Sequence, residues 1–148
     1  MKKRSKIITI CSSASFYKEA MEYKKKLEAM GFKVLVPVTA LRMHRAGNYD
    51  VSKHKHWYKD PKMYYQKTAK MKEHLRQVEK GDITFVINLT KKGISGYIGG
   101  NVLLEIFYAW MKKKPIYILN KVSDKCGLKE EVLGMNPIFI DGDLKLIR

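Results

Sequence analysis

One carboxylate, Glu105, stands alone in an apolar run directly behind a double glycine, in the stretch "SGYIGGNVLLEIFYAW". If a helix begins near Asn101, Gly99 and Gly100 let the backbone approach a ligand closely, and the free N–H groups of the first helical turn point the same way. The helix dipole keeps a carboxylate one turn further on ionised and oriented. Such a group could act as a nucleophile, a general base or a ligand for a sugar hydroxyl. The alternative is a glutamate that only completes a capping interaction.

The net charge is the strongest compositional signal. The chain has 148 residues and a formal net charge of +16. A domain this basic attracts nucleotides, nucleic acids and acidic surfaces through its long-range field. The charge therefore indicates a phosphate-bearing ligand before it indicates DNA, unless the lysines only form solvated faces.

Metal ligation is not expected from the histidines and cysteines. His44, His54 and His56 have no carboxylate or thiolate in register with them, and Cys11 and Cys126 form neither a disulfide framework nor a metal-ligand pair at short spacing. The sequence predicts no metal and no cofactor.

Strands that alternate with helices are needed to position these groups. Short apolar, β-branched runs predict strands, and apolar residues that recur every three or four positions predict helices. The expected strands are 6–11, 32–36, 82–88, 115–120 and 137–140, and the expected helices are 16–30, capped by Ser15, then 61–80 and 101–113. This order predicts an α/β fold, a Rossmann-like or flavodoxin-like three-layer sandwich with a mostly parallel five-stranded sheet. Ligands then bind at the carboxyl ends of the strands.

The segment from Thr39 to Asp60 has no clean period and mixes basic residues with aromatic ones, most densely over 42–59. We expect a loop or lid here. Trp57 and its neighbours could stack on a base or on single-stranded nucleic acid, or they could fold back on the core.

The chain is the length of one domain, so a single domain over 1–148 is expected. No apolar run is long enough to cross a membrane, and the basic start is followed too soon by serines to form a signal peptide. We expect a cytoplasmic protein without membrane association.

The sequence also resembles a known family. The stretch "GYIGGNVLLEIFYAWMKKKPIYIL" resembles the signature of the nucleoside 2-deoxyribosyltransferase-like superfamily, in which a glycine-bearing loop precedes a helix with the catalytic glutamate, followed by Lys-Pro and a strand. Glu105, Lys114 and Pro115 keep that spacing. The segments "KIITICSSASFYKEAMEYKKKLEAMGFKVLVP" and "KEEVLGMNPIFIDGDL" are similar to the first and last parts of small members, so the resemblance covers the chain except roughly 40–65.

The resemblance implies that Glu105 attacks the anomeric carbon of a nucleoside or nucleotide, expels the base and forms a glycosyl-enzyme intermediate. Water would complete a hydrolysis, and a second base would complete a transfer. Because a monophosphate is a dianion and the chain is strongly basic, we expect a (deoxy)nucleoside 5′-monophosphate hydrolase. The alternatives are a nucleoside 2-deoxyribosyltransferase and a non-catalytic nucleotide-sensing or nucleic-acid-binding domain of the same fold.

The turn after the first strand would lie beside Glu105 and could present hydroxyls and N–H groups to a 5′-phosphate, although serines there also suit turns and caps. The expected partners are the nucleotide substrate and, by the resemblance, further copies of the chain in a homodimer or larger assembly; nucleic acid is a weaker expectation. The expected catalytic residues are Glu105, His74 and Tyr97. The expected substrate-binding residues are Ser12, Ser13, Ser15, Asn88, Gly99, Gly100 and Asn101.

Three positions depart from the family pattern. Ser12 stands where many relatives have glycine, and Phe107 stands where they tend to have a small residue. His74 stands where the family often places an aspartate. A histidine, with a solution pKa near ~6.5, could protonate a departing base; alternatively, His74 is a solvated surface residue.

Overall fold

Five parallel strands form one sheet in the computed structural model, which describes residues 2–148. The order β2-β1-β3-β4-β5 is that of flavodoxin-like folds, and every neighbouring pair in the described chain is parallel. The predicted fold class is therefore confirmed, with a wholly parallel sheet. The strands are β1 (Ile7–Ser12), β2 (Lys33–Leu35), β3 (Ile83–Ile87), β4 (Ile116–Ile118) and β5 (Ile138–Phe139).

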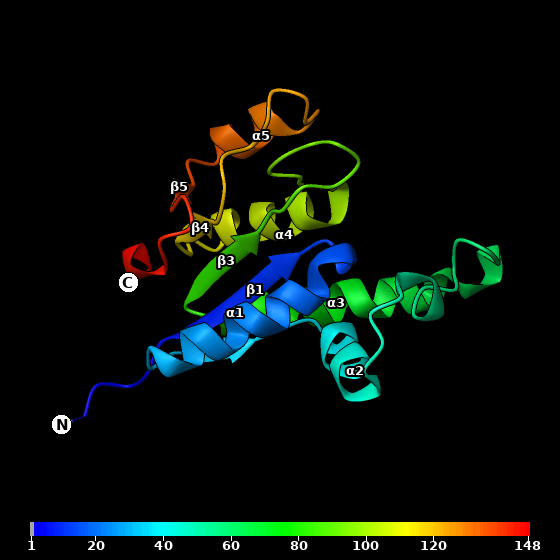
Figure 1. Ribbon diagram of the computed structural model, residues 1–148, viewed down its shortest axis with the longest axis horizontal. Helices are drawn as coiled ribbons and strands as arrows, with labels where there is room; N and C mark the ends of the chain where they lie inside the picture. The colour runs from blue at the N-terminus through cyan, green and yellow to red at the C-terminus, as the bar shows by residue number, and fades with distance from the viewer. Residues whose placement is uncertain (1) are drawn as a thin grey trace.

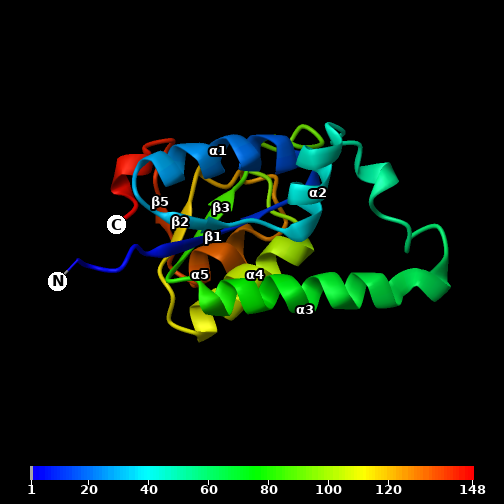
Figure 2. The ribbon, with the colours of Figure 1, turned by 90° about the horizontal axis from the view of Figure 1, so that it is seen from below.

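Helices cover both faces of the sheet (Figures 1 and 2). One face packs against α1 (Tyr17–Ala29) and α2 (Val38–Ala46), and the other packs against α3 (Tyr64–Lys80), α4 (Gly100–Met111) and α5 (Lys129–Gly134). All five residues of β3 are buried, as expected for a strand with a helix layer on each side. None of the described helices is long and apolar enough to cross a membrane.

The start of the first helix differs from the prediction. A 3-10 turn, η1 (Ala14–Phe16), precedes α1, and no side-chain cap is made at either start. Ser15 therefore lies inside the turn, and its predicted capping role is wrong. The last residue of the predicted apolar face, Met30, is 43% exposed, because the chain leaves the helix at this point.

The segment predicted as a loop is partly helical. Pro37 stands at the N-cap of α2, and Thr39, Ala40 and Met43 turn one face of the helix into the core. Gly47, at φ 63°, ends the helix. The remainder, 47–63, contains only the short 3-10 turns η2 (Val51–Lys53) and η3 (Pro61–Met63), and it projects beyond the sheet beside the start of α3 (Figure 2). The helix α5 was not predicted at all.

The loop after β3 is fixed against the end of β4. The Asn88 side chain accepts the Asn120 N–H at 2.9 Å and donates to the Asn120 carbonyl at 2.7 Å. Gly96, at φ +62°, packs so tightly that an added Cβ would lie 2.0 Å from the Lys121 carbonyl oxygen. This loop leads directly into α4, so its shape sets where that helix begins.

We expect Gly96→Ala to reduce the free energy of unfolding more than Gly93→Ala does. Both glycines have positive φ, but a Cβ at Gly93 meets nothing within 4 Å. Gly93→Ala should cost about 1–2 kcal/mol from backbone strain alone, and Gly96→Ala about 1–3 kcal/mol more from the clash. Urea unfolding measures both, and equal losses would contradict the close packing of the loop.

Candidate functional site

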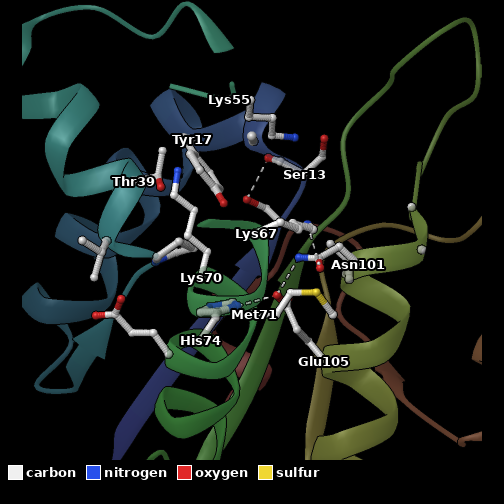
Figure 3. Close-up of a pocket in the computed structure, with 18 of the residues that line it drawn as sticks. Ser13, Tyr17, Thr39, Lys55, Lys67, Lys70, Met71, His74, Asn101 and Glu105 are labelled. Carbon is white, nitrogen blue, oxygen red and sulfur yellow. Dashed lines mark hydrogen bonds and ion pairs between the residues drawn. The ribbon is translucent and has the colours of Figure 1, made fainter. Parts of the chain in front are cut away.

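A cavity of about 240 Å³ lies at the carboxyl ends of the strands (Figure 3). Ser12 and Ser13 line it just after β1, Thr39 lines it at the start of α2, and Lys91 lines it in the loop after β3. The helices α3 and α4 complete the wall. In the strand order β2-β1-β3, connections leave β1 and β3 toward opposite faces of the sheet, which is where flavodoxin-like folds bind ligands.

The centre of the cavity is a buried contact between Glu105 and His74, which are 4% and 7% exposed. Glu105 Oε1 lies 2.5 Å from His74 Nδ1 and accepts a hydrogen bond of 3.1 Å from Asn101 Nδ2. On its other side the ring Nε2 donates to the Ile10 carbonyl at 3.1 Å. Carbonyl and carboxylate oxygens only accept, so both ring nitrogens have an acceptor for a proton and the ring suits the imidazolium form.

The charge state follows from this geometry. Burial lowers the pKa of His74, but the negative charge of Glu105 and the hydrogen bonds to Glu105 and Ile10 outweigh it, so the pKa is raised above 6.5. His74 and Glu105 therefore form an ion pair within the fold. The alternative in which His74 is a solvated surface residue is wrong.

The two carboxylate oxygens of Glu105 differ in their hydrogen bonding. Oε2 is buried and has no hydrogen-bond partner among the residues that the structure describes. Buried polar atoms are nearly always satisfied, so an unpartnered oxygen on a residue that lines a cavity calls for an explanation, and a ligand that reaches it would supply one. Oε1 holds the carboxylate in place while Oε2 keeps its lone pairs free.

Tyr17 and Cys11 adjoin this pair, and the sequence did not single them out. Burial, then the charge of Glu105, raises the pKa of Tyr17 above its ordinary value, so the phenol stays protonated, and its hydroxyl points into the cavity (Figure 3). Tyr17 begins α1 directly after the serine turn, and that position was the available signal. Cys11 gave none, since it reads as one more buried residue of a strand.

The same cluster contains three possible metal ligands. Atoms of Cys11, His74 and Glu105 lie within 4.8 Å of one another, and thiolate, imidazole and carboxylate are all zinc ligands. However, burial and the nearby Glu105 charge raise the pKa of Cys11 well above 9.0, which disfavours the thiolate. A cation would also have to replace the His74–Glu105 hydrogen bond. The arrangement suits proton transfer better than metal binding.

The other predicted site residues separate into two groups. Asn88 and Ser15 do not line the cavity: Asn88 is occupied in holding the loop, and Ser15 is exposed in η1. Of the residues predicted to catalyse or bind substrate, these line the cavity: Glu105, His74, Tyr97, Ser12, Ser13, Gly99, Gly100 and Asn101.

The basic side chains that line the cavity were not among the site residues predicted from the sequence. Lys67 donates to Asn101 Oδ1 at 3.1 Å, and Lys91 donates to Ser13 Oγ at 2.9 Å. Trp57, only 7% exposed, lines the cavity and carries the ammonium group of Lys70 at 4.8 Å from its ring centroid. Of the two alternatives for Trp57, it folds back on the protein, yet it still faces the cavity.

Fold and cavity together define a class of protein: a parallel α/β domain with a buried carboxylate at its ligand-binding edge. Within that class, the chain is similar in structure to a 2-deoxyribosyltransferase from the psychrotolerant bacterium Bacillus psychrosaccharolyticus, with a TM-score of 0.59, over 91% of this chain and 85% of that one. The sequences are 16% identical, so the likeness establishes a shared fold. No protein-family model and no curated protein matches the sequence.

We expect the stability of the fold to fall as pH rises above 6.5. The raised pKa of His74 means that the folded state binds this proton more tightly than the unfolded state does. The ion pair's contribution is therefore fully present below the unfolded pKa and is lost as pH passes through the folded pKa. Urea unfolding at a series of pH values measures this loss.

Two variants test whether His74, and not another histidine, causes this dependence of stability on pH. His74→Asn keeps a donor near Glu105 Oε1 but cannot titrate, so it should lack the loss seen above pH 6.5. His56→Asn removes an exposed histidine and should keep the wild-type profile. Identical profiles for wild type and His74→Asn would refute the ion pair.

Proposed function

We propose that the protein cleaves the N-glycosidic bond of a (deoxy)nucleoside 5′-monophosphate, with Glu105 as the nucleophile. The observation that carries the proposal is the state of its carboxylate. Oε1 is bound by His74 and Asn101, whereas Oε2 has no hydrogen-bond partner in the described chain, and Glu105 lines the cavity. A retaining glycosidase needs one ionised carboxylate held still with one oxygen free to attack. The resemblance around Glu105 and the shared fold support the same chemistry.

In the first step, Glu105 Oε2 attacks the anomeric carbon and the carbon–nitrogen bond breaks, so that its electron pair leaves with the base. The new ester is neutral and removes the negative charge that raises the pKa of His74. Burial then dominates and lowers that pKa, so the imidazolium becomes a stronger acid as the base departs. The proton at His74 Nδ1 moves to the base, directly or through a cavity water.

In the second step, water attacks the same carbon and breaks the ester bond. Neutral His74, still held by Nε2–H on the Ile10 carbonyl, takes the water proton at Nδ1. The carboxylate and the imidazolium are thereby restored together. If a second base attacks in place of water, the same intermediate gives transfer. The transferase is thus the second candidate, favoured by the structural likeness to a 2-deoxyribosyltransferase.

The phosphate is proposed from the serine turn and the charge around it. Lys91 bonds Ser13 beside the first turn of the chain after β1, and both line the cavity. A 5′-phosphate here would accept charge-assisted hydrogen bonds that a 5′-hydroxyl cannot. Tyr17 and Tyr97, also in the lining, supply hydroxyls for the sugar or the base.

The non-catalytic alternative rests on Ser12 and Phe107, where the chain departs from the family pattern. Phe107 is 49% exposed on the outer side of α4 and does not line the cavity, so it leaves Glu105 undisturbed. Ser12 is 5% exposed and its hydroxyl bonds the Ser13 carbonyl at 3.2 Å. Neither residue obstructs the proposed reaction.

We expect Glu105→Gln to abolish base release. An amide keeps an acceptor for Asn101 and His74 but cannot form the glycosyl ester, so turnover should fall at least about 10³-fold. Incubation with a panel of ribo- and deoxyribonucleoside monophosphates, with free base followed by chromatography, measures the rate and identifies the substrate. The corresponding nucleosides, which lack the phosphate, should be turned over less efficiently.

Glu73→Gln is the matched control, because Glu73 lines the cavity but is exposed and bonds none of the catalytic groups. It should keep most of the wild-type rate. Wild-type turnover by Glu105→Gln, with a native circular dichroism spectrum, would rule out the nucleophile.

We also propose a homo-oligomer that buries the outer face of α4. Its apolar side chains Leu104, Phe107, Trp110 and Met111 are 46–59% exposed, and the Phe107 and Trp110 rings lie 5.9 Å apart. Contiguous apolar surface of this kind usually marks an interface.

Light scattering should show a dimer or larger for the wild type and a monomer for Trp110→Glu. Tyr65→Glu, on an exposed residue of α3, introduces the same charge elsewhere and should leave assembly unchanged. A monomeric wild type at micromolar concentration would refute the interface.

A further inference from the structure

The cavity is far more basic than its reacting groups require. Its lining contains only two carboxylates, Glu73 and Glu105, and Glu105 is already paired with His74. Five cations face them, from four different parts of the fold: Arg42 on α2, Lys55 on the projecting segment, Lys67 and Lys70 on α3, and Lys91 after β3.

These cations are not neutralised, and three of them are oriented by neutral groups. In the described chain, none of the five forms an ion pair with a carboxylate. Instead, Lys70 donates to the His54 carbonyl at 3.0 Å, while Lys67 and Lys91 donate to the neutral oxygens of Asn101 and Ser13. Neutral acceptors fix a side chain without cancelling its charge, so the site is prepared for an anion.

Aromatic rings add to this orientation. The ammonium groups of Lys67 and Lys70 lie 5.7 and 4.8 Å from the Trp57 ring centroid, and that of Lys91 lies 5.2 Å from the Tyr97 ring centroid. Cation–π contacts of this kind hold an ammonium group without consuming its positive charge. Trp57 thereby joins the projecting segment to the cations of α3.

The cations also act on one another. Burial, then the charge of Lys67, lowers the pKa of Lys55; burial, then Arg42, Lys55 and Lys67, lowers that of Lys70. Burial and Lys55 also lower the pKa of Lys91. Lys55 thus links the Lys91 side of the cavity with the side formed by Arg42 and Lys70. The repulsion is continuous across the cavity, and a bound polyanion would relieve it.

One phosphoryl group is too small for this arrangement. A monophosphate has three terminal oxygens and at most two charges, which Ser13, Lys91 and one further donor satisfy. Lys67 is held by Asn101, next to Glu105, and so belongs to the sugar end of the cavity. Lys55, Lys70 and Arg42 then remain without a partner on the substrate.

We infer that the preferred ligand is a nucleotide with at least two linked phosphoryl groups, the first at Ser13 and Lys91 and the second at Lys55, Lys70 and Arg42. The inference rests on the proposed function for the reacting end and extends it to the substrate class. A nucleoside diphosphate is therefore a better substrate than the monophosphate with the same base.

Isothermal titration calorimetry on the full chain tests the second subsite without knowledge of the base. Inorganic pyrophosphate should bind at least about tenfold more tightly than orthophosphate, since it gains charge-assisted hydrogen bonds that orthophosphate lacks. Deoxyadenosine 5′-diphosphate and 5′-monophosphate, titrated into Glu105→Gln to prevent turnover, should differ in the same direction. Equal affinities in both pairs would overturn the inference.

Single substitutions test which lysines cause the preference for pyrophosphate over orthophosphate. Lys55→Met and Lys70→Met, made separately, should each reduce the pyrophosphate preference severalfold and affect orthophosphate less. Lys72→Met is the control, since it removes one charge from an exposed position of α3 outside the cavity. An equal loss in the control would show attraction by the overall charge and overturn the subsite. The subsite would also be overturned if a single-stranded oligonucleotide bound more tightly than pyrophosphate and Lys72→Met weakened that binding.

The two proposals can fail independently. Preference for pyrophosphate without base release from any nucleotide would refute the glycosidase and leave the second subsite standing. Base release from monophosphates at the same catalytic efficiency as from diphosphates would refute the second subsite and leave the glycosidase standing.

Discussion

The buried ion pair between His74 and Glu105 is the interaction on which the rest of the site depends. It joins α3 to α4, and through the Ile10 carbonyl it joins both helices to β1. A buried pair of this kind gains little net stability, but loss of either partner leaves an uncompensated charge and is costly. The pair therefore constrains the relative position of the two helices.

The presence of a histidine opposite Glu105 determines the charge state of its carboxylate. Where the resemblance places an aspartate, two neighbouring acids would compete to stay ionised, and one would take up a proton. With His74 there, the carboxylate faces an opposite charge and Oε2 is left without a partner. The same exchange places a transferable proton beside the Glu105 carboxylate. Asn101 and Lys67 extend the pair toward the cavity as a continuous hydrogen-bonded series.

Around this centre the protein gathers positive charge that it does not neutralise. Lysines from a projecting segment, a helix and a strand-end loop converge on one cavity. Those of the helix and the loop are held by neutral oxygens and by the rings of Trp57 and Tyr97. Convergence of like charges destabilises a fold unless a ligand of opposite charge is bound. The net charge is therefore not only a property of the outer surface, because part of it faces the ligand site.

Sequence alone predicted the alternation of strands with helices and singled out Glu105, because both depend on short-range patterns. Apolar runs and the helix starts near Pro61 and Asn101 follow from residues close in the chain, and the double glycine stands at the start of the helix that carries Glu105. Tertiary structure decided what required distant residues to meet. The contact of His74 with Glu105 joins positions 31 residues apart, and the lysines of the cavity come from separate elements. Sequence periodicity could not distinguish a buried His74 from a solvated one, nor a serine that lines a cavity from Ser15 in a turn, because the difference lies in which helix packs against the residue and not in its neighbours along the chain.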